Sequence, residues 1–189
     1  MSTLRKYQYG NISVQKSIML LVLFLLPLCA TMDFSVSFLF MCLFIFFLLW
    51  ISVVDIQTGL ILNRVLLLFS FCWLLQQFFI PLHSIGSVLC AAVGSSSFLW
   101  FLRIISGGGM GCGDIKFVFV LGLWLGVNGI FLTLLLAFIF GGVAALVLLL
   151  FTPRQFCDKM PFGPFLSLGA YISFLYQPHF FRILEEGFL

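Results

Sequence analysis

The chain has 189 residues, of which 63% are apolar and only 8% are charged, with a net charge of +3. Soluble domains carry about 25% charged and about 45–50% apolar residues, and a globule of this size cannot bury so much apolar surface. With a mean hydropathy of +1.25, the composition excludes a soluble enzyme, a nucleic-acid-binding protein and a disordered chain. It predicts an all-α, polytopic membrane protein, because the apolar runs lack the alternation of a transmembrane β-barrel.

A helix that crosses a bilayer needs about 20 largely apolar residues. Division of the chain at its charges, prolines and glycine clusters predicts about seven such helices. In chain order they are 18–32, 34–54, 65–82, 84–102, 116–128, 130–151 and 164–181. The first follows a basic start that superficially resembles a signal peptide. Because another apolar run comes almost at once, we interpret it as a retained span.

The basic residues predict the orientation in the membrane. With seven spans, one side of the membrane receives 1–17, 55–64, 103–115 and 152–163. Eight of the nine Lys and Arg residues lie on this side or at its edge, and only Arg182 falls on the other. Short cytoplasmic loops carry the excess of Lys and Arg. The pattern therefore predicts a cytoplasmic N-terminus and a C-terminus outside.

Small residues at four-residue spacing let helices approach closely. Gly122 with Gly126, and the stretch from Gly163 to Gly169, offer such surfaces, so we interpret these glycines as helix-packing positions. The six cysteines include no C-x-x-C pair, so the sequence predicts no zinc site and no disulfide framework. No metal or cofactor is expected.

Two of the six carboxylates stand out by their position. Asp33, Asp158, Glu185 and Glu186 fall in turns or in the polar end of the chain, where solvated charge explains them. Asp55 directly follows an apolar run, and Asp114 opens the fifth span. Carboxylates that border hydrocarbon are costly. Because two spans separate the pair, both are expected at the same membrane face.

Two carboxyl groups held close together cannot both ionise, so they share a proton. The charged partner can then take a proton from water while the neutral one protonates a substrate carbonyl, which is the chemistry of aspartic proteases. The simpler alternatives are that Asp114 caps a helix and that Asp55 pairs with Arg64. The glycines before Asp114, Gly111 and Gly113 among them, supply backbone that tolerates positive φ and leaves room for an extended substrate.

Three segments resemble, in order, the motifs of the prepilin peptidase (type IV leader peptidase) family, the GxGD aspartic membrane peptidases. They are 54–63 (VDIQTGLILN), 107–116 (GGGMGCGDIK) with 121–126 (LGLWLG), and 159–170 (KMPFGPFLSLGA). The likeness covers roughly residues 50–175. It implies catalytic roles for Asp55 and Asp114, a substrate-facing backbone loop with Gly111, Gly113 and Lys116, and a closing motif with Pro161, Gly163 and Pro164.

The resemblance further implies a membrane endopeptidase that cuts type IV prepilins or pseudopilins at the cytoplasmic face of the bacterial inner membrane. The expected organisation is an N-terminal cytoplasmic segment with an extra first helix at 1–33, a six-helix peptidase core at 34–182, and a short polar tail at 183–189. Leu62 departs from the proline that the family usually has before the last residue of its first motif. Without paired cysteines or a long loop between the first two spans, we expect no N-methyltransferase domain.

Two other functions fit membrane carboxylates. An ion-coupled transporter would use them as a relay, although both lie at one face and no inverted repeat is visible. A catalytically silent assembly protein of a pilus or secretion system would keep the fold without turnover. The oligomeric state, the particular prepilin and the pilus or secretion system are not specified by the sequence.

Overall fold

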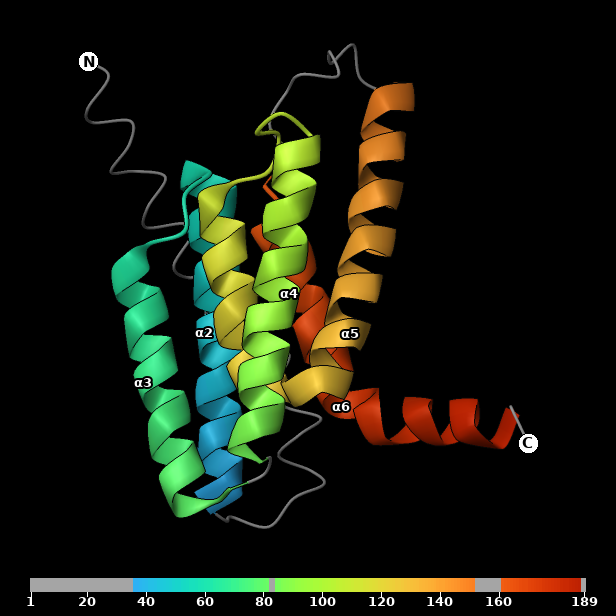
Figure 1. Cartoon of the computed structure of the whole chain (residues 1–189). Helices are drawn as coiled ribbons and strands as arrows, with labels where there is room; N and C mark the ends of the chain where they lie inside the picture. Colours follow the sequence, from blue (N-terminus) through green and yellow to red (C-terminus); the bar gives the residue numbers. More distant parts are fainter. Residues whose placement is uncertain (1–35, 82–83, 152–160, 188–189) are drawn as a thin grey trace.

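The computed structural model describes residues 36–81, 84–151 and 161–187, and all the regular structure there is helical. The predicted all-α fold is confirmed. The helices are α2 (Val36–Thr58), α3 (Asn63–Phe79), α4 (Ile85–Ile105), α5 (Cys112–Phe151) and α6 (Gly163–Gly187). Figure 1 shows them as a bundle whose members run roughly side by side, apart from the end of α6, which turns away from the others.

Four helices correspond to predicted spans, with ends that differ by a few residues. The spans at 34–54, 65–82 and 84–102 become α2, α3 and α4. The span at 164–181 becomes α6, whose helix continues to Gly187 through most of the expected polar tail. The expected first span at 18–32 lies outside the described residues, so the number of seven spans stays a prediction.

The predicted fifth and sixth spans, 116–128 and 130–151, are the two helical halves of α5, which meet at a kink. The backbone of α5 is helical except at Gly126, where φ is 65° and ψ is −173°. Figure 1 shows the element running down one side of α4, turning sharply, and returning upward on the other side. Residues other than glycine rarely adopt this φ. Gly126 is therefore the residue at which the chain reverses, a role beyond the helix packing expected of it.

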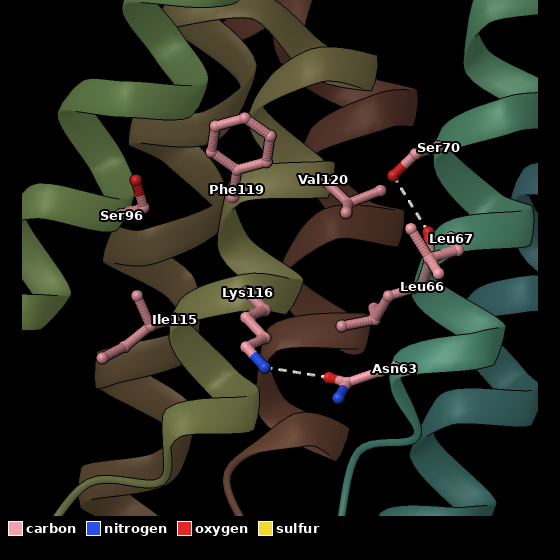
Figure 2. Close-up of a pocket in the computed structure, with 9 residues that line it drawn as sticks. All are labelled: Asn63, Leu66, Leu67, Ser70, Ser96, Ile115, Lys116, Phe119 and Val120. Carbon is pink, nitrogen blue, oxygen red and sulfur yellow. Dashed lines mark hydrogen bonds between the residues drawn. The ribbon is translucent and has the colours of Figure 1, made fainter.

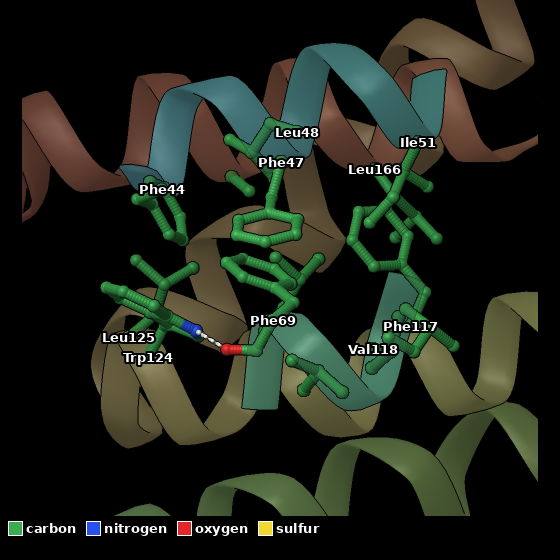
Figure 3. Packing of buried hydrophobic residues seen from close by; sticks show 14 of the residues in the cluster. Phe44, Phe47, Leu48, Ile51, Phe69, Phe117, Val118, Trp124, Leu125 and Leu166 are labelled. Atoms are coloured by element: carbon green, nitrogen blue, oxygen red, sulfur yellow. Dashed lines mark hydrogen bonds between the residues drawn. The ribbon is translucent and has the colours of Figure 1, made fainter. Parts of the chain in front are cut away.

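Below the upper end of the bundle, aromatic rings fill the space between α2, α3 and α5 (Figure 3). The ring centroid of Trp124 lies 5.2 Å from those of both Phe44 and Phe69. Its indole N–H donates a 3.3 Å hydrogen bond to the Phe69 carbonyl. All three side chains are buried. This cluster joins α2 and α3 to the first half of α5.

Two glycines bring helices into close contact. A Cβ at Gly122 would lie 2.6 Å from the Ala92 Cα on α4, and one at Gly169 would lie 2.6 Å from the Thr133 carbonyl oxygen on α5. Real Cβ atoms essentially never come this near to backbone atoms. The prediction that Gly122 and Gly169 pack helices together is therefore confirmed.

Much of the outer surface is apolar, as expected of helices that face lipid. Exposed large side chains include Leu67 and Phe78 on α3 and Trp100 on α4. Within the described ranges, three helices are long and apolar enough to cross a membrane: α2, α4 and residues Cys112–Leu148 of α5.

The close contact at Gly122 yields the first testable prediction. Gly122→Ala should destabilise the protein by about 1–3 kcal/mol, because the new methyl group overpacks the interface with Ala92. Gly142→Ala is the matched control, since a Cβ at that position in α5 meets no atom within 4 Å. Thermal unfolding in detergent should show a lower midpoint for the first variant only. Equal midpoints would contradict the packing seen here.

Candidate active site

The structure brings Asp55 and Asp114 together at one end of the bundle. Asp55 lies in the last turn of α2 and is 4% exposed, and Asp114 lies in the first turn of α5 and is 8% exposed. Figure 1 shows the end of α2 and the turn between α4 and α5 at the same, upper end. The two carboxyl groups are close enough for the charge of Asp55 to act on Asp114.

The carboxyl group of Asp55 is bound by the start of α6. The backbone N–H of Gly163 donates a buried 2.9 Å hydrogen bond to Asp55 Oδ2, across 108 positions of the sequence. A Cβ at residue 163 would lie 2.6 Å from that same oxygen. Only a glycine lets the first turn of α6 approach this closely. The closing motif thus contributes a backbone donor to the acidic pair.

Prolines flank this donor and help to explain why α6 begins here. Pro161 lies just before the helix, and Pro164 is its second residue. Proline is favoured in the first turn, where its missing N–H would have no helical partner. The carbonyl of Phe162 accepts hydrogen bonds from Phe165 and Leu166 and so closes the first turn. Lys159 and Met160, which begin the motif, lie outside the described residues.

Asp114 is held by the turn that precedes its own helix. The backbone N–H of Gly111 donates a hydrogen bond to its carboxyl group. Asp114 is the third residue of α5, so it occupies the position from which an acidic side chain reaches back to the start of a helix. It is therefore not the N-cap residue itself. Within the described residues, Asp55 forms no ion pair with Arg64, the other alternative.

The two glycines on either side of Cys112 are constrained by contacts. A Cβ at Gly111 would lie 2.9 Å from Asp114 Oδ2, and one at Gly113 would lie 3.0 Å from the Cβ of Ile61. In the glycine run itself, positive φ occurs at Gly107 and Gly108. The run thus uses the positive φ that glycine tolerates at Gly107 and Gly108, whereas Gly111 and Gly113 do not adopt it. The side chain of Cys112 accepts a hydrogen bond from Arg103.

The side chain of Lys116 is bound to the start of α3. Its ammonium group donates a 3.0 Å hydrogen bond to Asn63 Oδ1 at the start of α3. Figure 2 shows this bond at one end of a groove of about 560 Å³. The groove lies between α3, α4 and α5 and is lined by Asn63, Leu66, Leu67, Ser70, Ser96, Ile115, Lys116, Phe119 and Val120. Sequence reasoning identified Lys116 but not its partner, because nothing in the spacing relates positions 63 and 116.

A second cavity of about 260 Å³ lies between α2 and α6. Pro164 lines it, together with Ser52 and Ser167. Ser167 Oγ is buried without a hydrogen-bond partner within the described part of the chain. Within the same ranges, no three His, Cys, Asp or Glu side chains come close enough together to hold a metal ion.

These features define a helical membrane protein with a pair of buried carboxyl groups at one end, each bound by a backbone N–H beside a helix start. Comparison with known proteins gives the family. The model of the type IV leader peptidase family matches residues 42–146, which is more than half of the chain. The chain therefore belongs to the type IV leader peptidase family. The match includes α2 with Asp55 and the glycine loop with Asp114.

Individual relatives agree with this assignment. The prepilin leader peptidase/N-methyltransferase of Bacillus subtilis is 34% identical over 137 residues, which is 70% of this chain and 54% of that protein. The protein of the same name from Burkholderia pseudomallei is 28% identical over 142 residues, which is 72% of this chain and 46% of that protein. The chain thus spans about half the length of these relatives. No solved structure matches it.

The bond between Gly163 and Asp55 yields the second prediction. Gly163→Ala should lower the peptide cleavage that is proposed in the next subsection by about 100-fold, since a displacement of a reacting group by about 1 Å costs this much. The protein should still be inserted and abundant, because the change affects one buried contact at the end of the bundle. Gly86→Ala, where a Cβ meets nothing within 4 Å, is the control. A fully active Gly163→Ala enzyme would show that Asp55 does not need this contact.

Proposed function

We propose that this protein is an aspartic endopeptidase that removes the leader peptide of type IV prepilins or pseudopilins. The observation that carries the proposal is the meeting of Asp55 and Asp114 from two separate motifs, at buried positions on one end of the bundle. Family membership and the names of the relatives support the same reaction. A backbone N–H donor lies beside each carboxyl group. Gly111 of the glycine loop is the donor for Asp114, and Gly163 at the start of α6 is the donor for Asp55.

The mechanism follows from the shared proton of a carboxyl pair. The ionised member takes a proton from a water molecule between the two groups, and the water oxygen attacks the carbonyl carbon of the scissile peptide. The protonated member gives its proton to the carbonyl oxygen. Collapse of the tetrahedral intermediate then breaks the C–N bond as the departing nitrogen gains a proton. The products are the leader, with a new carboxyl end, and the mature chain, with a new amino end.

The third prediction concerns this pair. Asp55→Asn and Asp114→Asn should each abolish cleavage of a prepilin, because the two groups act as one unit and the loss of either removes the chemistry. Leader removal is measured as a mass shift after incubation of membranes with a panel of prepilins and pseudopilins. Asp158→Asn is the control, since sequence places it in a loop between basic residues, and it should remain active.

The outcomes separate the alternatives. Normal turnover by either folded Asn variant would contradict the carboxyl pair as the catalytic group. A wild-type protein that cleaves no member of the panel would favour a silent assembly protein. Ion flux in proteoliposomes that depends on Asp55, without any cleavage, would favour a transporter.

We further propose that the acidic end of the bundle faces the cytoplasm, with the N-terminus on the same side and the C-terminus outside. The distribution of basic residues supports this orientation. Arg64, Arg103 and Lys116 all belong to segments at the acidic end, and cytoplasmic loops are the ones that carry such charge.

The orientation is the subject of the fourth prediction. In a variant that lacks the native cysteines, G108C should react with a membrane-impermeant thiol reagent only when the cytoplasmic side is accessible. The reason is that Gly108 lies in the exposed turn between α4 and α5. Labelling is compared between intact cells and inverted membrane vesicles. Reaction in intact cells alone would reverse the proposed topology.

A further inference from the structure

The hydrogen bond between Lys116 and Asn63 joins the ends of two helices beside the acidic pair. The donor is the Lys116 ammonium group in the second turn of α5, the acceptor is Asn63 Oδ1, and the two are 3.0 Å apart across 53 positions of the sequence. Figure 2 shows the lysine side chain extended from α5 toward the first turn of α3.

Asn63 is not used as a helix cap. Asparagine near a helix start usually accepts a hydrogen bond from a free backbone N–H of the first turn. Here Asn63 is the first residue of α3, and the N-cap residue Leu62 provides no side-chain hydrogen bond. The amide oxygen of Asn63 instead accepts the hydrogen bond from Lys116. Asn63 therefore links α3 to α5 and does not cap the start of α3.

The short loop that precedes Asn63 contacts both acidic segments. At one end, the N–H of Gly59 donates a 2.7 Å hydrogen bond to the backbone carbonyl of Asp55. In the middle, Ile61 lies against Gly113, and a Cβ at residue 113 would lie 3.0 Å from the Ile61 Cβ, closer than an ordinary contact. At the other end, Asn63 is bound to Lys116. The loop at 59–62 is therefore a bridge from Asp55 to the residue before Asp114.

The two helices that carry the acidic residues meet through side chains such as Phe44 and Trp124, but their backbones stay apart. α2 packs on α3 and α6, whereas α5 packs on α3, α4 and α6. In the described part of the chain, the backbones of α2 and α5 make no contact of their own. The separation of Asp55 and Asp114 thus depends on the elements between them. On one side this is the start of α6, and on the other it is the 59–62 loop.

We infer that Lys116 is a positioning residue, which through Asn63 holds the 59–62 loop against Gly113 and so fixes the separation of the two carboxyl groups. The inference rests on the proposed peptidase function. Lys116 itself touches neither carboxyl group nor, on this account, the substrate. The bond joins a charged donor to a neutral acceptor at the exposed end of the bundle.

The test compares the steady-state kinetics of prepilin cleavage. Lys116→Met keeps the length of the side chain but removes the donor, and Asn63→Leu removes the acceptor. Each should lower kcat by roughly 10- to 100-fold, the cost of about 1 Å of misplacement, with KM nearly unchanged. The double variant should lose no more than either single variant, because both break the same bond. Asn63→Asp keeps an acceptor oxygen and should retain most of the activity.

Arg64→Met is the matched control. It removes a positive charge one residue from Asn63, at the same end of the bundle, but leaves the bond to Lys116 intact. Its kcat should equal that of the wild type. Lys116→Met with normal kcat would overturn the inference. An increase in KM alone would also overturn it, since it would make Lys116 a substrate-binding residue.

A second measurement does not require activity. In a chain without native cysteines, D55C and D114C are combined, and the rate of their linkage by a short bifunctional thiol reagent is measured. Adding Lys116→Met should slow this linkage several-fold, whereas adding Arg64→Met should not. An unchanged rate would overturn the positioning role, even if the protein proved not to be a peptidase. Failure of the proposed function would instead appear as absence of cleavage by the wild type.

Discussion

The hydrogen bond from the Gly163 N–H to the Asp55 carboxyl group is the contact on which the arrangement of the acidic end depends. A buried acidic group without a donor is costly, by about 1–3 kcal/mol or more when it is charged. In this protein the donor comes from a segment 108 positions away. The bond therefore joins α6, the last described helix, to the acidic group at the end of α2, the first described helix. Without this bond, α6 would still pack on α2, but no hydrogen bond would fix the position of its first turn relative to the Asp55 carboxyl group.

The same solution is used for the second acid. Asp114 is bound by the N–H of Gly111, just before α5, as Asp55 is bound by an N–H in the first turn of α6. Helix starts carry free N–H groups and the positive end of the helix dipole. The starts of α5 and α6 lie beside the buried side chains of Asp114 and Asp55, respectively. A Cβ at Gly163 would lie 2.6 Å from Asp55 Oδ2, and one at Gly111 would lie 2.9 Å from Asp114 Oδ2, so a larger residue would displace the acidic group at either position.

The sequence predicts the local features of this molecule better than the contacts between them. Apolar runs gave α2, α3, α4 and α6 within a few residues, because membrane helices need little more than length and hydropathy. The reversal expected between the spans at 116–128 and 130–151 lies a few residues earlier, at Gly126, since a glycine in an apolar run fits both close packing and a bend. Asp55, Asp114 and the glycine loop could be predicted from their positions at the ends of apolar runs and from their agreement with the family motifs.

The partners of these residues were beyond sequence reasoning. The bonds from Gly163 to Asp55 and from Lys116 to Asn63 join segments whose separation in the chain carries no periodic signal. Their geometry depends on how five helices pack, and a one-residue change in any helix end would alter it. Agreement with the family motifs therefore indicated that Gly163 and Lys116 belong to the site. The packed structure adds what each residue contacts: Gly163 binds Asp55, and Lys116 binds Asn63.

The reversal at Gly126 has a consequence for the depth of the protein in the bilayer. From Cys112 to Leu125 the helix rises about 21 Å at 1.5 Å per residue, whereas the hydrocarbon core is about 30 Å thick. If its start reaches the membrane surface, the chain must turn back while still inside the lipid layer, where peptide groups find no water. The hydroxyl groups of Thr133 and Ser173 both donate to the Gly129 carbonyl, at 2.8 and 2.7 Å. These two hydroxyls bind a carbonyl three residues beyond the turn and so link α6 to the second half of α5 close to the reversal.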